Sequence, residues 1–314
     1  MVTKFEDMKI AVIIPCYNES LTISKVVGDF QRRLPHADIF VFDNNSTDDS
    51  NSKAYSAGAT VIKEKRQGKG FVVSAMLKKV VADIYVMVDG DDTYPAEVVA
   101  DLIQPIVKGE ADMVVGQRMF QYSENAFRPF HVFGNRLVRG IINCVFSSKL
   151  QDPMSGYRVF TREIAIELPV VAYGFDVETE MTIQLLFRKF VIKEIPIYYR
   201  ERHVGSISKL RTFRDGFIIV RKIFSIVRAY KPLTFFGGGG IIFIFIGFLL
   251  AIYSITRLLT LEPWDVLVFL FVSIICIISG LISGSVGLIL HTLNFRLLEL
   301  SSTVIKSTNN KSNG

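Results

Sequence analysis

The chain has 314 residues, of which 50% are hydrophobic, and a formal net charge of +6. This length suffices for one sizeable soluble domain with an appendage, and no motif of interleaved aromatic and basic residues indicates nucleic-acid binding. The three cysteines have no paired spacing and suit a reducing compartment, and the four histidines show no ligand spacing for zinc. Residues 1–9 are polar and charged, so we expect no signal peptide.

Short apolar runs alternate with helical stretches along the first part of the chain. The runs predict five strands, at residues 9–14, 39–42, 60–62, 84–88 and 113–115. Helices are expected between them, for example over residues 71–81 and 96–107. This alternation predicts a doubly wound, mostly parallel α/β sheet of the Rossmann-like class, in which ligands bind beyond the carboxyl ends of the strands.

Polar clusters follow four of the predicted strands, at residues 15–19, 43–48, 89–92 and 116–118. Any one of them is compatible with an ordinary turn. Because all four strand ends would lie on one edge of one sheet, we expect the clusters to converge on a ligand site.

The acidic cluster Asp89, Gly90, Asp91 and Asp92 stands at the end of a buried strand. Carboxylates gathered in this way repel one another, and a divalent cation removes the conflict. Mg²⁺ or Mn²⁺ prefers hard oxygen ligands and bridges phosphates. We therefore predict a Mg²⁺ or Mn²⁺ site on Asp89 and Asp91, and the alternative is a solvated acidic turn closed by Pro95.

The C-terminal part contains two uncharged runs, residues 232–256 and 266–295, each longer than the roughly 20 residues that span a bilayer. They predict a two-helix transmembrane hairpin at 232–295, although two buried core helices are the alternative. Residues 200–231 are rich in Lys and Arg, whereas the loop at 257–265 is not, which predicts a cytoplasmic N-terminal domain. The protein would be an integral membrane protein, in the plasma membrane if the source is a bacterium.

Three shorter segments complete the predicted organisation. Residues 211–231 have apolar and basic faces, which indicates an interfacial amphipathic helix on the bilayer, with a core-packed helix as the alternative. Residues 296–314, rich in Ser, Asn and Lys, are predicted to be a disordered cytoplasmic tail. The glycines at 237–240 allow close helix packing in lipid, including packing in a homo-oligomer.

Several motifs occur together in a characteristic order. They are PCYNE at 15–19, DNNSTDDS at 43–50, GKG at 68–70, DGDD at 89–92, GQR at 116–118, QDPMSGYR at 151–158, GFDVETE at 174–180 and the basic stretch at 202–210. Over about residues 9–210 the chain resembles the GT-A glycosyltransferases of family 2. It is most similar to the dolichyl- and polyprenyl-phosphate sugar transferases, the dolichol-phosphate mannose synthases among them, some of which are anchored in membranes. Family members often read DDGS where this chain has residues 43–46 as DNNS, so the nucleobase stays open.

The resemblance implies a glycosyltransferase domain at 1–210 and roles for its residues. A nucleoside pocket would be formed by Pro15, Tyr17, Glu19 and Asp43. Asp91 would bind the metal, Asp89 the metal or the ribose, and Arg202 would fold over the donor phosphates. Lys69 opens a helix whose amides could face phosphate. The alternatives are core packing for Tyr17 and a surface turn for the GKG motif.

The acceptor implied by the resemblance is a lipid monophosphate, which is already anionic at neutral pH, so that cations matter more than a strong base. Candidate cations for its phosphate are Arg118, Arg136, Arg200 and Lys209. An acidic residue, Glu178 or Asp176, would act as a base or orient the acceptor site, although carboxylates also suit a helix start. Asp91, Glu178 and Lys209 are the predicted catalytic residues.

The predicted function is transfer of a hexose from a UDP- or GDP-sugar to a polyprenyl phosphate, with inversion, at the cytoplasmic membrane face. Such a product would serve cell-envelope glycan synthesis. One alternative is a transferase acting on a lipid-linked saccharide or polysaccharide, but processive relatives usually carry a QxxRW motif and more spans, neither of which is present. A catalytically inactive membrane scaffold is the other, and intact Asp89, Asp91 and Lys209 argue against it.

Overall fold

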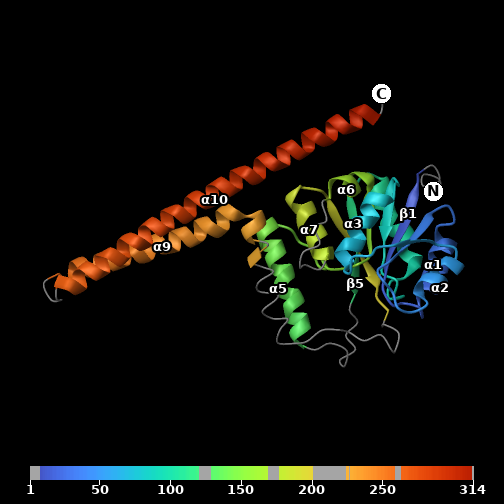
Figure 1. Cartoon of the computed structure of the whole chain (residues 1–314), viewed down its shortest axis with the longest axis horizontal. Coiled ribbons are helices and arrows are strands. Elements are labelled where there is room, and N and C mark those ends of the chain that lie inside the picture. The colour runs from blue at the N-terminus through green and yellow to red at the C-terminus, as the bar shows by residue number, and fades with distance from the viewer. Residues whose placement is uncertain are drawn as a thin grey trace. The chain divides into compact units, whose positions relative to one another are not determined.

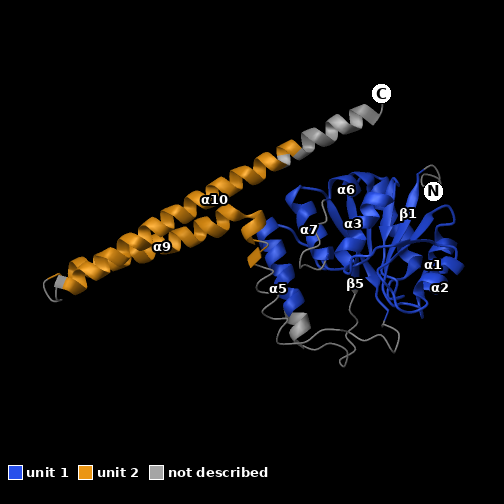
Figure 2. Cartoon of the chain, in the orientation of Figure 1, with its two compact units in different colours: residues 1–216 blue, residues 217–314 orange. Residues whose placement is uncertain are grey.

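The computed structural model describes residues 8–119, 129–168, 177–200, 224–225, 227–258 and 263–312. The chain forms two compact units, residues 1–216 and 217–314, which Figure 2 shows in blue and orange. The first unit is an α/β domain, and the second contains two long apolar helices.

The first unit contains a seven-stranded sheet in the order β3-β2-β1-β4-β6-β5-β7. Its strands are β1 (Ile10–Cys16), β2 (Asp38–Asp43), β3 (Thr60–Lys63), β4 (Ile84–Met87), β5 (Met113–Met119), β6 (Arg158–Thr161) and β7 (Ile192–Tyr198). In the described part of the chain, only β6 runs antiparallel to its neighbours, β4 and β5. The predicted mostly parallel α/β fold is confirmed, with one reversed strand.

Helices cover both faces of this sheet (Figure 1). They are α1 (Ile23–Arg33), α2 (Ser50–Ser56), α3 (Lys69–Lys79), the 3₁₀ turn η1 (Ala96–Val98) with α4 (Val99–Val107), α6 (Arg162–Glu167) and α7 (Val177–Phe187). The unit also contains α5 (Pro129–Phe146), which contacts α7. Successive side chains of a strand point to opposite faces. Val12 of β1 accordingly packs in one core with α1 and α4, whereas Ile13 packs in the other with α3 and α7.

All five predicted strands are present, and β5 is longer than expected. Residues 116–118 continue β5 because they pair with Ile195, Pro196 and Ile197 of β7. Neither β6 nor β7 was predicted: β6 has only four residues, and β7 interrupts its apolar positions with Lys193, Glu194 and Pro196. A proline is tolerated in β7 because this strand lies at the edge of the sheet.

The second unit consists of α9 (Pro232–Thr256) and α10 (Pro263–Ser312) in its described part, together with a helical segment at 224–225 and 227–230. Two segments, Pro232–Thr256 and Trp264–Leu297, are long and apolar enough to cross a membrane, with mean hydropathies of 2.4 and 2.9. Only 11% and 17% of their most apolar windows are buried, which argues against the alternative of two soluble core helices.

Glycine and serine allow α9 and α10 to approach closely. A Cβ added to Gly240 would lie 2.6 Å from the carbonyl oxygen of Gly280, and the Ser273 hydroxyl donates a 2.7 Å hydrogen bond to the Gly247 carbonyl. Around Gly238 and Gly239 an added Cβ meets nothing within 4 Å. The predicted close packing therefore occurs within the hairpin at Gly240, and homo-oligomerisation stays a prediction.

The C-terminal segment differs from expectation. We predicted a disordered tail at 296–314, but α10 continues to Ser312. No Gly or Pro occurs between residues 288 and 312, and Arg296 forms a 2.8 Å ion pair with Glu299 one turn later, which supports continuation of the helix. Most of the predicted amphipathic helix at 211–231 lies outside the described residues.

Candidate active site

The loops that follow β1, β2 and β4 meet at one edge of the sheet, whereas the fourth predicted cluster, residues 116–118, lies within strand β5. The Asn18 amide donates a 3.0 Å hydrogen bond to the Ser46 hydroxyl, which joins the loops after β1 and β2. The Thr22 hydroxyl donates a 2.7 Å bond to the Gly90 carbonyl and joins the loops after β1 and β4. These hydrogen bonds assemble three strand ends into one surface.

Each of these three loops contains a non-glycine residue in the left-handed region. The residues are Asn18 with φ 56°, Asn45 with φ 61° and Asp92 with φ 59°. Asn and Asp tolerate this conformation better than other residues because their short polar side chains bond locally. Such backbone conformations concentrate at functional sites, where surrounding contacts hold them in place.

A cation stands between two acidic side chains at the centre of this edge. The Lys69 ammonium, at the first residue of α3, lies 2.5 Å from Asp89 Oδ1 and 2.5 Å from Glu178 Oε1 of α7. The cluster draws together the GKG, DGDD and GFDVETE motifs, which are far apart in the sequence. Sequence reasoning did not identify this contact, since it assigned Lys69 to nucleotide-sugar binding at a helix start whose amides could face phosphate.

Burial and the charges of neighbouring side chains shift the pKa values of Asp89 and Glu178 in opposite directions. Burial raises the pKa of Asp89, and the attraction of Lys69 does not reverse the rise, because Glu178 and Asp91 add negative charge. Burial also opposes ionisation of Glu178, but the Lys69 charge outweighs it and lowers the pKa of Glu178. The two carboxylates raise the pKa of Lys69 well above its ordinary value despite burial, so Lys69 remains a cation.

The remaining acidic residues of the loop after β4 are held separately. Asp91 is buried, and its Oδ1 accepts a 2.6 Å hydrogen bond from the Thr93 hydroxyl. Asp92 turns toward α1, where its Oδ1 lies 2.6 Å from the Lys25 ammonium and 3.3 Å from a nitrogen of Arg200. Asp92 is thereby held away from the central cluster, whereas Asp89 lies in that cluster beside Lys69 and Asp91 is buried in the same loop.

The asparagines that depart from the family pattern organise the neighbouring loop. The Asn44 side chain donates to the carbonyl oxygens of Glu64 and Arg66 and accepts from the amide of Gly68, at 3.1, 2.8 and 2.8 Å. Gly68, with φ 133°, immediately precedes Lys69. Asn44 thus sets the position from which Lys69 enters the cluster.

The predicted nucleoside residues lie around the same edge. Pro15 and Asp43 are buried at the ends of β1 and β2, where Asp43 Oδ1 accepts a 3.2 Å bond from the Ser46 amide. The Tyr17 side chain is 39% exposed, which excludes the alternative of core packing. A Cβ added to Gly90 would lie against Glu19 Oε2, so this carboxylate approaches the backbone of the acidic loop.

The predicted acceptor cations are distributed over several elements. Arg118 of β5 forms a bidentate ion pair with Asp152, with N–O distances of 2.7 and 2.8 Å. Arg136 is exposed on α5, and Arg200 pairs with Asp92 and Glu97. Arg118 and Arg200 thus pair with different carboxylates. Asp176, Arg202 and Lys209 lie outside the described residues.

The turn at 152–157 leads into β6 and borders the site. The fully buried Arg158 donates to the carbonyl oxygens of Ser155 and Pro153, at 2.9 and 2.7 Å, and to the Thr182 hydroxyl at 3.0 Å. Burial lowers the pKa of Arg158 to about 10. The sequence motif at 151–158 contains Arg158 but does not indicate that this arginine is buried.

The carboxylate oxygens of the site are ligands of the kind that a hard divalent cation prefers. Among the residues that the structure describes, no group of three or more His, Cys, Asp or Glu side chains is arranged to hold a metal ion. Two carboxylates, Asp89 and Asp91, nevertheless suffice for the mode in which Mg²⁺ is bound by one or two carboxylates plus substrate phosphates. The predicted metal site is therefore compatible with the residues present.

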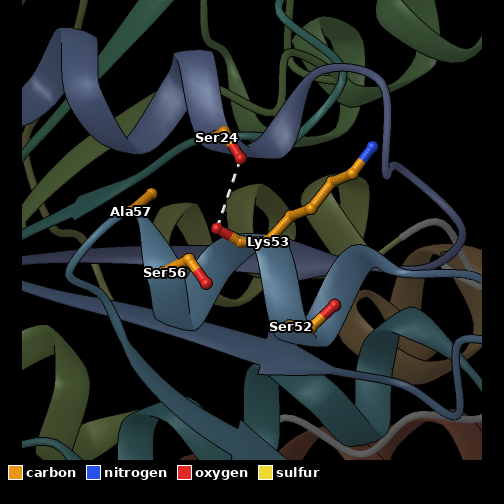
Figure 3. Close-up of a pocket in the computed structure, with 5 residues that line it drawn as sticks. All are labelled: Ser24, Ser52, Lys53, Ser56 and Ala57. Carbon is orange, nitrogen blue, oxygen red and sulfur yellow. Dashed lines mark hydrogen bonds between the residues drawn. The ribbon is translucent and has the colours of Figure 1, made fainter.

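A separate, shallow pocket lies between α1 and α2 (Figure 3). Its volume is about 270 Å³, and it is lined by Ser24, Ser52, Lys53, Ser56 and Ala57. The Ser24 hydroxyl donates a 3.2 Å bond across it to the Lys53 carbonyl. None of these lining residues belongs to the predicted site.

Comparison with known proteins identifies the family of this chain. The family model described as glycosyl transferase family 2 matches residues 11–168. Glycosyltransferase AglJ of Haloferax volcanii is 32% identical over 245 residues, which cover 78% of this chain and 80% of that protein. The chain belongs to glycosyltransferase family 2.

Other relatives agree with this family 2 assignment. A protein named dolichyl-phosphate hexose transferase, also from Haloferax volcanii, is 29% identical over 219 residues, covering 70% of this chain and 93% of that protein. Among solved structures, a Mycobacterium tuberculosis glucosyl-3-phosphoglycerate synthase in complex with Mn²⁺, UDP-glucose and phosphoglyceric acid aligns with a TM-score of 0.57 and 22% identity. The alignment covers 71% of this chain and 80% of that one, and at this identity it shows the shared GT-A fold. This family 2 chain is a glycosyltransferase.

Proposed function

We propose that this family 2 enzyme transfers a hexose from a UDP- or GDP-sugar to a polyprenyl phosphate, with inversion, at the cytoplasmic face of a membrane. The observation that carries the proposal is that the same chain contains both the Lys69–Asp89–Glu178 cluster and two exposed apolar helices. Support also comes from the relatives named dolichyl-phosphate hexose transferase and, from Pyrococcus furiosus, dolichol-phosphate mannosyltransferase, which is 27% identical over 214 residues.

The donor half of the site follows from the loops after β1, β2 and β4. We assign the exposed Tyr17 ring to the nucleobase, together with Pro15 and Asp43, and Glu19 to the ribose hydroxyls. Asp89 and Asp91 would hold the divalent metal, which when bound supplies charge neutralisation of the leaving diphosphate. Lys69 adds a fixed positive charge beside Asp89, and Arg202 would complete the contacts to the donor phosphates.

Glu178 is better suited to orientation than to proton transfer. Its Oε1 contacts the Lys69 ammonium at 2.5 Å, so its negative charge is already committed to that cation. A phosphate acceptor needs no strong base, because its oxygen is anionic at neutral pH. In the reaction this oxygen forms a bond to the anomeric carbon as the bond from that carbon to the nucleoside diphosphate breaks, and the configuration inverts.

Cations would hold the acceptor phosphate near the donor. Asp152 fixes the guanidinium of Arg118 through two hydrogen bonds, and Arg118 lies over the Tyr199 ring at 5.5 Å. We propose that Arg118, Arg136, Arg200 and Lys209 contribute to acceptor binding through charge-assisted hydrogen bonds. The approach of a lipid phosphate from the bilayer would bring it to these groups.

A donor and acceptor screen tests the proposal. Membranes containing the chain are incubated with radiolabelled UDP- and GDP-hexoses and undecaprenyl phosphate, with undecaprenol as the matched acceptor lacking phosphate. We expect one donor to give a labelled glycolipid that requires the phosphate and yields the inverted anomer. Label found only in a polymer or in a lipid-linked saccharide would favour the glycan-acceptor alternative, and transfer from no donor would contradict the proposal.

The membrane orientation is a further part of this proposal. The loop at 257–265 is poor in Lys and Arg, whereas residues 200–231 are rich in them, so α9 and α10 would place the catalytic unit in the cytoplasm. Nucleotide-sugar donors are made in that compartment. The native cysteines offer a test, because Cys144 in the catalytic unit is exposed and Cys16 is buried.

We expect an impermeant thiol reagent on intact cells to leave Cys144 unlabelled and to label it after permeabilisation. A Thr260→Cys variant made with Cys144→Ser and Cys276→Ser should be labelled in intact cells without permeabilisation. Gel shift of the purified chain measures the extent of labelling. Labelling of Cys144 in intact cells, with protection of the cysteine at position 260, would reverse the proposed orientation.

A further inference from the structure

Two tyrosines whose rings are in contact, Tyr94 and Tyr157, differ in whether their hydroxyl groups form hydrogen bonds. The rings of Tyr94 and Tyr157 lie 5.5 Å apart, and the residues are only 5% and 0% exposed. The Tyr94 hydroxyl accepts a 2.9 Å hydrogen bond from the amide of Gly156. The Tyr157 hydroxyl is buried with no hydrogen-bond partner in the described part of the chain.

Gly156 forms a wall behind the carboxylate of Asp89. A Cβ added to Gly156 would lie 2.5 Å from Asp89 Oδ2 and 3.0 Å from its Cγ. The carboxylate therefore rests against the bare Cα of this glycine, and the position of the Gly156 backbone limits where Asp89 can lie. Any shift of Gly156 is transmitted to one of the two predicted metal ligands.

Tyr94 connects this wall to the acidic loop that carries Asp89. Tyr94 follows Asp89 by five positions in the same loop, and its ring also packs against Tyr199 at 5.2 Å. The turn itself is held from its other side, because the Ser155 hydroxyl donates a 2.6 Å bond to the Gly116 carbonyl. Tyr94 of the acidic loop thus holds the Gly156 backbone by a hydrogen bond, and the Asp89 carboxylate of the same loop lies against that backbone.

We propose that Tyr94 is a positioning residue for divalent-cation binding: its hydroxyl holds Gly156 so that the Asp89 carboxylate keeps the orientation that a metal requires. The inference rests on the proposed function for the assignment of Asp89 to the metal. Tyr94 itself contacts neither metal nor substrate in this role. Tyr157, whose hydroxyl bonds nothing in the described residues, provides the matched control.

The test compares Tyr94→Phe with Tyr157→Phe in the purified full chain in detergent. Electron paramagnetic resonance of free Mn²⁺ measures metal binding directly, with UDP and with GDP present. We expect Tyr94→Phe to weaken Mn²⁺ binding about three- to tenfold, chiefly through loss of the neutral hydrogen bond from the Gly156 amide, since the contact from the Ser155 hydroxyl is long at 3.5 Å. Tyr157→Phe should match the wild type. Gly156→Ala should weaken binding further, since its Cβ would displace Asp89.

Enzyme assays and thermal unfolding distinguish this positioning role of Tyr94 from a general contribution to the stability of the fold. With Tyr94→Phe, the Mn²⁺ concentration for half-maximal transfer should rise while kcat at saturating Mn²⁺ recovers to within about twofold, since only metal occupancy is impaired. Thermal unfolding identifies any variant that is not folded. Equal Mn²⁺ affinity in Tyr94→Phe and the wild type would overturn the proposal, as would equal weakening in both Phe variants or a wild type that binds no Mn²⁺. Tyr94-dependent Mn²⁺ binding without any sugar transfer to polyprenyl phosphate would support Tyr94 and overturn the proposed function instead.

Discussion

Asp91→Asn is expected to lower the rate of sugar transfer by about a thousandfold. A metal at a developing anionic leaving group supplies several kcal/mol of transition-state stabilisation, and each ~1.4 kcal/mol changes the rate tenfold. The amide keeps the shape of Asp91 and its contact with Thr93, but removes the negative charge that attracts the cation. Initial rates with the radiolabelled donor identified by the screen measure the effect.

The control for this variant is Asp92→Asn, one position later in the same loop. Asp92 pairs with Lys25 and Arg200 instead of joining the central cluster, so we expect a loss of only a few fold. Chelation by EDTA should abolish transfer by the wild type, and added Mg²⁺ or Mn²⁺ should restore it. Full activity in excess EDTA would disprove the metal role of both Asp89 and Asp91.

Lys69→Met is expected to give the second large effect, a loss of about thirty- to 150-fold in kcat/KM. Breaking a buried ion pair costs about 3–5 kcal/mol, and because the Lys69 side chain is 38% exposed we expect about 2–3 kcal/mol. Methionine keeps the aliphatic length but leaves Asp89 and Glu178 as facing negative charges. The loss also removes a cation beside the diphosphate. Steady-state kinetics with donor and metal varied separately measure it.

Lys25→Met tests whether any lysine bound to the acidic loop has this effect. Lys25 lies 2.6 Å from Asp92, about as close as Lys69 lies to Asp89, but its side chain is 51% exposed. Exposed ion pairs contribute about 0–1 kcal/mol, so this variant should lose less than about fivefold. Equal losses in the two lysine variants would show that the loop needs its ion pairs generally, and would remove the special role of Lys69.

The ends of the parallel strands were predictable because local sequence determines them. The buried run before Asp89 and the similar run before Pro15 each identify a central strand, and parallel strands bring their carboxyl ends to one edge. The same local patterns cannot show which side chains meet across that edge. Lys69 contacts Glu178, and Arg118 contacts Asp152, only because helices and strands far apart in sequence pack together.

Other parts of the site were hidden for different physical reasons. The motif at 151–158 was recognised, but the full burial of its Arg158 was not, because arginine is normally a surface residue and its partners here are backbone carbonyls and a hydroxyl. Edge strand β7 has a mixed pattern that resembles a loop. The predicted contacts of Arg202 and Lys209 stay predictions, since those residues lie outside the described part of the chain.

The reversed strand β6 has a consequence for how this enzyme can be re-engineered. A strand that runs against its neighbours brings the segment that enters it, and not the segment that leaves it, to the edge where β4 and β5 end. The Gly156 wall behind Asp89 thus belongs to the connection from α5 to β6, which is separate from the loops after β1, β2 and β4. Grafting that connection from a relative would reshape the wall behind Asp89 without changing the register of any parallel strand.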